Sequence, residues 1–168
     1  MSKAVLISIR PEWAAKIATG EKTVEIRKTR PNLETPFKCY IYETQGKSDT
    51  PWIDEDGHMI FRGRGKVVGE FVCDTYVTDK TFGHDALFNA VACMIEPDVV
   101  AYSAGTPLYG WHISNLKIYD TPKELSKFSR PFENCIGKTC DEFGCALCEN
   151  GGHIKRPPQS WRYVEELK

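Results

Sequence analysis

The sequence lacks a net charge of either sign, because 22 lysines and arginines nearly balance 23 aspartates and glutamates over 168 residues. It therefore has no overall electrostatic attraction to nucleic acid or to a membrane surface, and any such partner must contact a local patch. No apolar run approaches the length of a membrane span, and no internal repeat is visible. These absences favour a globular protein with no membrane partner.

Secretory features are also missing. The chain opens on a strand-like run at residues 4–9, with no signal-peptide pattern before it. Its seven cysteines are an odd number, which argues against a disulfide framework and for reduced thiols. We therefore expect a cytoplasmic protein, and a chain of this length suits one domain over residues 1–168.

The hydrophobic pattern predicts many strands and few helices. Strands are expected at residues 4–9, 22–28, 37–44, 66–76, 108–119 and 159–164. A helix is expected from Pro11, which suits a first turn, to Gly20, which ends it. Further helices are expected at 85–95 and 97–104, a hairpin at 45–65, and a loop with one helical turn at 120–134. This order indicates an α+β fold, a small mixed β-barrel with a few short flanking helices.

The predicted strand at residues 22–28 has one wholly polar face. Alternation places Lys22, Val24, Ile26 and Lys28 on one side and Thr23, Glu25 and Arg27 on the other. Residues 1–30 also hold seven basic side chains against three acidic ones, which indicates a local anion-binding patch. The competing interpretation is a solvated edge on which Glu25 and Arg27 form an exposed ion pair of little energetic value.

The segment Gly20-x-Lys22-x-x-Glu25-x-Arg27 resembles the signature of the activating signal cointegrator homology (ASCH) domain. Further motifs agree in order: Ile-Ser-Ile-Arg-Pro at 7–11, Gly-Glu-Phe at 69–71, Tyr-Gly-Trp-His-Ile at 109–113 and Pro-Pro-Gln-Ser-Trp at 157–161. The C-terminal motif is similar to that of a bacterial and prophage-borne subgroup. The resemblance covers nearly the whole chain, least so residues 45–65 and 135–153, and it implies a PUA-like β-barrel.

The resemblance also implies a cleft for RNA, DNA or a modified nucleoside beside the signature strand. We accordingly interpret the chain as a nucleic-acid or modified-nucleotide binding module. Lys22 offers a mobile ammonium, and Arg27 offers a planar fork for phosphate or a base edge. Glu25 is suited to accept from a ring N–H or an exocyclic amine. Arg10 is expected as a second cation at the mouth of the same pocket.

Tryptophans are candidates for stacking on bases, because every base presents a π-face. We expect Trp161 to be the stacking residue, since it follows Ser160, a further candidate contact, on the last strand. Trp13 is expected at the core or the rim, and Trp111 in the core.

An alternative function is hydrolysis of a modified nucleoside or of RNA. Some ASCH-like proteins hydrolyse the acyl amide of N4-acetylcytidine with a Lys-x-x-Thr pair, and others cleave RNA. This chain keeps Lys22 but has Glu25 at the position of the nucleophilic threonine. A carboxylate there is suited to general-base catalysis through water, with Lys22 and Glu25 as catalytic residues. A third hypothesis is a protein-interaction module that uses the hairpin at 45–65.

Sulfur and imidazole side chains are crowded into residues 135–153. They are Cys135, Cys140, Cys145, Cys148 and His153. Their close spacing suits tetrahedral zinc, and few apolar residues surround them, so a metal would form the core of this insertion. The four cysteines are candidate ligands of a structural zinc, with His153 as an alternative; the other interpretations are free thiols or a redox pair. The remaining cysteines, Cys39, Cys73 and Cys93, are expected in the core.

Overall fold

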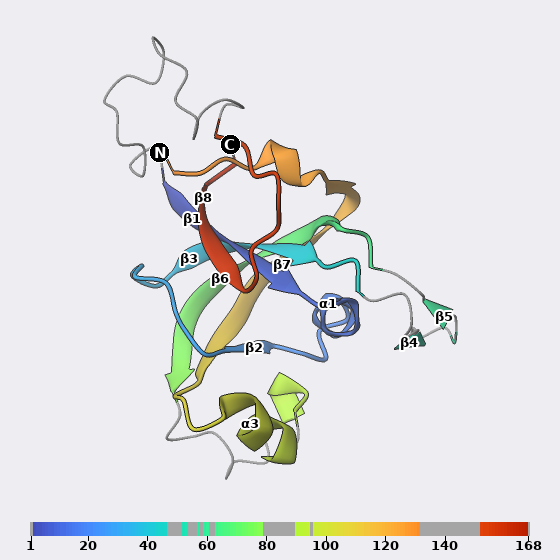
Figure 1. Ribbon diagram of the computed structural model, residues 1–168, viewed down its shortest axis with the longest axis vertical. Coiled ribbons are helices and arrows are strands. Elements are labelled where there is room, and N and C mark those ends of the chain that lie inside the picture. Colours follow the sequence, from blue (N-terminus) through green and yellow to red (C-terminus); the bar gives the residue numbers. More distant parts are fainter. Residues whose placement is uncertain are drawn as a thin grey trace.

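A six-stranded mixed sheet forms the centre of the computed structural model, which describes residues 2–46, 52–53, 57, 59–60, 63–78, 90–94, 96–131 and 152–167. The strands are β1 (Lys3–Ile9), β2 (Val24–Arg27), β3 (Phe37–Glu43), β6 (Lys66–Thr78), β7 (Tyr109–Lys123) and β8 (Trp161–Glu165). Their order is β2-β7-β6-β3-β1-β8, with β1 parallel to β3 and every other pair antiparallel. The sheet curls into a half-barrel (Figure 1). The predicted α+β fold of a small mixed barrel is confirmed.

The helices are short and lie outside the sheet. Helix α1 (Pro11–Ala18) follows β1 directly, α3 (Glu96–Ser103) precedes β7, residues 90–92 are helical, and a 3-10 turn, η2, spans Leu125–Lys127. Strands β4 (Trp52–Ile53) and β5 (Met59–Ile60) pair as the predicted hairpin, with Gly57 at a φ of 83° between them. Within the described residues, no helix is long and apolar enough to cross a membrane.

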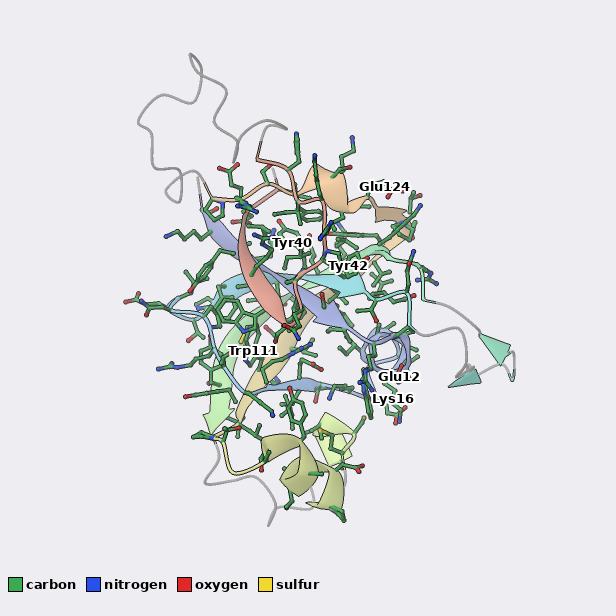
Figure 2. All side chains as sticks on the ribbon, viewed as in Figure 1. Glu12, Lys16, Tyr40, Tyr42, Trp111 and Glu124 are labelled. Atoms are coloured by element: carbon green, nitrogen blue, oxygen red, sulfur yellow. The ribbon has the colours of Figure 1, made fainter. Side chains whose placement is uncertain are left out.

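Both faces of β1 are buried, which explains why its sequence is a continuous apolar run. One cluster contains Val5, Ile7 and Ile9 together with Ile17 of α1 and Trp111; the other contains Ala4 and Leu6 together with Tyr40, Phe128 and Ile154. Because side chains alternate along a strand, the odd-numbered apolar residues of β1 enter the first cluster and the even-numbered apolar residues enter the second. Tyr40 and Trp111 are both fully buried (Figure 2), so the core position predicted for Trp111 is confirmed.

Some predicted boundaries were wrong. β2 begins at Val24 and not at Lys22, so the strand alternation does not extend to Lys22. β7 continues through Lys123, where a loop was predicted from residue 120, because Lys123 still pairs with Val67 of β6. The helix predicted at 85–95 is described only from residue 90, and it ends before Cys93. Cys93 has a φ of 54° and is half-buried, so it is not a core residue.

Candidate functional site

The signature segment folds back beneath α1 before it enters the sheet. Gly20 has a φ of 81°, a conformation that favours glycine, and ends the helix as predicted. The Lys22 amide then donates to the Lys16 carbonyl at 2.9 Å, and the Thr23 amide donates to the Val91 carbonyl at 2.9 Å. These bonds hold Lys22 outside the β2 ladder. Its side chain is therefore directed by the turn and not by the alternation of the strand.

Along β2 the predicted alternation holds. Val24 and Ile26 pack into a cluster with Ala92, Val99 and Leu108, which includes a residue of α3. Glu25 and Arg27 lie on the opposite side of the strand, facing β1 and β8. The apolar side anchors the strand, and the polar side forms one wall of a pocket.

Lys22, Glu25 and Arg27 form a buried row of charges. The Glu25 carboxylate lies 2.9 Å from Arg27 Nη2 and 3.6 Å from Lys22 Nζ. Only 3% of Lys22, 7% of Glu25 and 9% of Arg27 is exposed, so the competing interpretation of a solvated edge is wrong. Lys22 Nζ also donates to the Ala92 carbonyl at 2.5 Å. Burial lowers the pKa of Lys22 below its ordinary value, and the nearby Glu25 carboxylate opposes this shift.

Arg27 connects the two edges of the curled sheet. From β2, at one edge, its Nη2 donates to the Ser8 carbonyl at 2.7 Å and its Nη1 to Ser160 Oγ at 3.4 Å. Ser160 immediately precedes β8, at the other edge. Just beyond, Trp161 Nε1 donates to Thr29 Oγ1 at 2.9 Å. Side chains therefore close the half-barrel where no backbone ladder does so, and they do it at the pocket.

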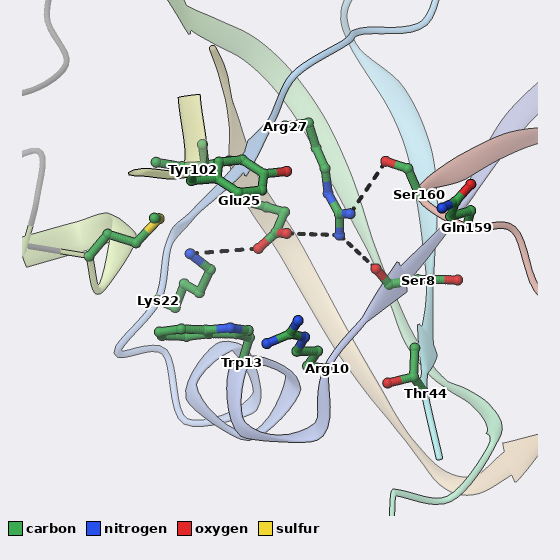
Figure 3. A pocket seen from close by; sticks show the side chains of 12 residues that line it. Ser8, Arg10, Trp13, Lys22, Glu25, Arg27, Thr44, Tyr102, Gln159 and Ser160 are labelled. Carbon is green, nitrogen blue, oxygen red and sulfur yellow. Dashed lines mark hydrogen bonds and ion pairs between the residues drawn. The ribbon is translucent and has the colours of Figure 1, made fainter. Parts of the chain in front are cut away.

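The pocket between these elements measures about 520 Å³ (Figure 3). It is lined by Ser8, Arg10, Trp13, Lys22, Glu25, Ile26, Arg27, Thr44, Met94, Tyr102, Gln159 and Ser160. Three of these residues are basic and only Glu25 is acidic, so the lining carries a surplus of positive charge. Among the described residues, Arg27 Nη1 makes a single, long hydrogen bond, 3.4 Å to Ser160 Oγ. The guanidinium therefore retains donor capacity for a ligand.

Two aromatic side chains stand at the charged end of the pocket. Trp13 of α1 and Tyr102 of α3 lie on opposite sides of the Lys22 and Glu25 side chains (Figure 3). Lys22 Nζ lies 5.3 Å from the centroid of the Trp13 ring, within the range of a cation–π contact. Trp13 is half-buried, packs against the first core cluster and lines the pocket, so it lies at the rim, one of the two positions predicted for it. Tyr102 is 37% exposed.

The structure brings five of the six predicted binding residues into this pocket. They are Arg10, Lys22, Glu25, Arg27 and Ser160. Arg10 stands at the mouth with 77% of its side chain exposed, 4.0 Å from Glu12. Trp161 is not among the lining residues; it packs on Trp111 with ring centroids 6.0 Å apart. The sequence did not single out Tyr102, because no signature in that helix distinguishes it from a surface residue.

The predicted zinc ligands Cys135, Cys140, Cys145 and Cys148 lie outside the described residues. His153 is described; it is exposed, and its Nδ1 lies 3.3 Å from Ser129 Oγ. In the described part of the chain, no group of three or more His, Cys, Asp or Glu side chains is placed to hold a metal ion. The zinc site stays a prediction from the sequence.

The fold is a half-barrel, and a basic pocket with aromatic walls lies beside the signature strand. The chain belongs to the ASCH domain family, because the ASCH domain model matches residues 7–97, and the predicted resemblance is thereby confirmed. The ASCH domain is a PUA-like fold that is often proposed to bind RNA. The assignment to a bacterial and prophage-borne subgroup stays a prediction.

Crystal structures of an ASCH protein from Zymomonas mobilis have a similar fold. The structure of the unmutated protein is 20% identical to this chain with a TM-score of 0.62, and the match covers 97% of this chain and 88% of that one. A tyrosine-to-phenylalanine mutant is 18% identical with a TM-score of 0.62, covering 98% and 92%. A serine-to-alanine mutant is 18% identical with a TM-score of 0.62, covering 97% and 89%. At these identities the similarity concerns the fold alone. No curated protein sequence matches the chain.

Proposed function

We propose that this protein binds a nucleotide, free or within a single strand of RNA or DNA, in the pocket beside β2. The observation that carries the proposal is the buried row Lys22–Glu25–Arg27, which stands in an open pocket between two aromatic walls. Burying three ionisable side chains is costly unless they are paired, and a purely structural role is served as well by apolar residues. Their position at a ligand-sized opening favours recognition.

The chemistry of the lining suits each part of a nucleotide. A volume of about 520 Å³ falls within the range of small-molecule sites. Trp13 and Tyr102 offer faces for a base to stack on. Glu25 accepts hydrogen bonds from a ring N–H or an amine, while the surplus positive charge of Arg10, Lys22 and Arg27 favours an anionic ligand. A phosphate-bearing nucleotide matches this pattern better than a neutral nucleoside.

Calorimetric titration with nucleoside monophosphates, modified nucleosides and short RNA and DNA tests the proposal. We expect Tyr102→Leu and Trp13→Leu each to weaken binding by about 1–3 kcal/mol, the usual contribution of one stacked base. Val100→Ala is the control, because Val100 lies on the same helix as Tyr102, is 62% exposed and does not line the pocket. Binding that Trp13→Leu and Tyr102→Leu leave unchanged would show that the ligand site lies elsewhere.

Hydrolysis at the same site is the second candidate, favoured by the position of Lys22. A lysine whose pKa is lowered by burial exchanges protons closer to neutral pH than an exposed lysine, and Glu25 lies 3.6 Å away. Glu25→Gln separates the two functions. A hydrolase with Glu25 as general base loses turnover of an acylated cytidine or of RNA and keeps much of its binding. A wild-type protein that binds these compounds but forms no product excludes this candidate for them.

A further inference from the structure

A short basic segment leaves β2 directly after Arg27. Lys28, Thr29 and Arg30 are all exposed, in contrast to the buried residues of β2. Lys28 Nζ lies 5.2 Å from the centroid of the Tyr102 ring. The Arg30 guanidinium lies 5.5 Å from the Tyr76 ring and 5.8 Å from the Tyr109 ring. Both cations are therefore held against aromatic faces while remaining open to solvent.

In the part of the chain that the structure describes, Lys28 and Arg30 form no ion pair with a carboxylate. Among the described residues, neither side chain lies within 4.0 Å of an acidic group. Two lysines elsewhere on the surface are paired: Lys38 lies 2.9 Å from Glu166, and Lys66 lies 2.8 Å from Glu124. Contact with a tyrosine face orders a cation without cancelling its charge. Within the described residues, Lys28 and Arg30 thus present ordered positive charge with no paired carboxylate.

This basic segment is continuous with the pocket. Tyr102 lines the pocket and also lies under Lys28. Tyr109, which contacts Arg30, is the β7 partner of Arg27. Suppose that one base of a nucleic-acid strand enters the pocket between Trp13 and Tyr102. The strand that continues past Tyr102 would then meet Lys28 first and Arg30 next.

We infer that Lys28 and Arg30 bind the phosphodiester backbone of a single-stranded nucleic acid next to the nucleotide held in the pocket. The inference rests on the proposed function. Phosphate is the group that uncompensated lysine and arginine side chains bind in nucleic acids, and such contacts position the strand without reading its sequence. The strand is single because a base must leave a duplex stack to enter a pocket. The preferred ligand is then an oligonucleotide and not a free nucleotide.

The test compares oligonucleotides with mononucleotides as the salt concentration is varied. The probes are a mixed-sequence RNA of about ten nucleotides, the DNA of the same sequence, and the four ribonucleoside monophosphates. This length lies within the site sizes known for single-strand-binding OB folds. The double variant Lys28→Ala/Arg30→Ala should lose two phosphate contacts. We expect the slope of log K for oligonucleotide binding against log salt concentration to become shallower by about 1.4, and oligonucleotide affinity at low salt to fall about tenfold. Binding of the monophosphates is expected to stay unchanged.

A matched control removes one lysine and one arginine elsewhere. Lys117 lies on β7, where it pairs with Glu70 of β6, and Arg130 follows η2; both are exposed, and neither lines the pocket. Lys117→Ala/Arg130→Ala is expected to bind oligonucleotides like the wild type. Charge reversal in Lys28→Glu/Arg30→Glu is expected to weaken oligonucleotide binding more than the alanine substitutions do. If the variants lose equal affinity for RNA and DNA, Lys28 and Arg30 contact the phosphate backbone that both share. If only the affinity for RNA falls, the contact is specific to RNA.

The outcomes separate this inference from the proposed function. If monophosphates bind in the pocket but Lys28→Ala/Arg30→Ala keeps the affinity and salt slope of the wild type, the backbone site is refuted and the pocket stands. Oligonucleotides that bind no more tightly than monophosphates also refute it. If no nucleotide or oligonucleotide binds the wild type, the proposed function fails and this inference fails with it.

Discussion

The Glu25 carboxylate lies 2.9 Å from the Arg27 guanidinium, and both side chains are buried. Arg27 also donates to the Ser8 carbonyl and to Ser160 Oγ, so the same group faces the pocket and connects the two edges of the half-barrel. Closure of the fold and, under the proposed function, recognition of the ligand therefore depend on one side chain.

This double role predicts a large cost for removing Arg27. Arg27→Ala leaves the Glu25 carboxylate with only Lys22 at 3.6 Å and removes the donor to the buried Ser8 carbonyl. Breaking a buried pair costs about 3–5 kcal/mol, and we expect a loss of that size in denaturant unfolding. Arg10→Ala, at an exposed position, should change stability by about 0.5 kcal/mol or less.

A double-mutant cycle checks that the loss comes from the pair. Glu25→Ala/Arg27→Ala should be less destabilised than the sum of the single variants, because neither charge is then left alone. Additive effects, or a loss below about 1 kcal/mol for Arg27→Ala, would contradict the buried pairing. Binding studies should therefore rely on variants of Trp13 and Tyr102 in preference to Arg27.

The lowered pKa of Lys22 predicts a specific dependence of stability on pH. Between the lowered folded-state pKa and the ordinary value of 10.5, the folded protein has released a proton that the unfolded chain still holds. The free energy of unfolding therefore rises with pH in this window, and the cost of burying the charge is greatest below it.

Comparison with Lys22→Met isolates this effect. The stability of the wild type relative to Lys22→Met should increase as the pH rises from neutral towards 10.5, measured by urea unfolding at each pH. Burial raises the pKa values of Cys39 and Cys73, which lowers stability at alkaline pH, but equally in both proteins. A stability difference that stays constant with pH would show that Lys22 is not perturbed by burial.

The cysteines in the described core should resist alkylation. Burial raises the pKa of Cys39 well above its ordinary value and raises that of Cys73 to about 12. Because the thiolate is the reactive form, iodoacetamide near neutral pH should modify half-buried Cys93 before either of them. Peptide mass spectrometry over time measures the order, and all three should react in guanidinium. Early labelling of Cys39 or Cys73 in the folded protein would contradict their placement.

The zinc site predicted from the sequence is tested by elemental analysis. If Cys135, Cys140, Cys145 and Cys148 bind a structural zinc, purified protein should contain about one zinc per chain. Cys145→Ser/Cys148→Ser should lose the metal and Cys93→Ser should keep it. A molar ratio near zero, with no effect of a chelator on the melting temperature, would exclude the site.

Local patterns predicted the parts of the site that depend on neighbours in sequence. The alternation of β2 placed Glu25 and Arg27 together, and Gly20 marked the end of α1. Lys22 was assigned to the wrong face because its position is set by backbone bonds to Lys16 and through Thr23 to Val91, a contact distant in sequence. The strand period could not reveal that constraint.

The aromatic wall shows the limit of the sequence more clearly. Trp161, predicted to stack on a base because of its neighbours in sequence, packs on Trp111 and does not line the pocket found between the described residues; its stacking stays a prediction. Tyr102 comes from α3 and lines the same pocket as Trp13 only through the tertiary fold. Which aromatics face the pocket depends on how distant helices pack around β2, and no local periodicity encodes that arrangement.

Photocrosslinking tests the central claim most directly. RNA that carries 4-thiouridine or 6-thioguanosine is irradiated with the wild-type protein, and the crosslinked residue is identified by mass spectrometry. A base in the proposed pocket lies against Trp13 or Tyr102, so the crosslinks should map to one of these residues and be reduced by unlabelled competitor. Crosslinks confined to the far end of β7, around Tyr119, or an absence of specific crosslinks would contradict the account.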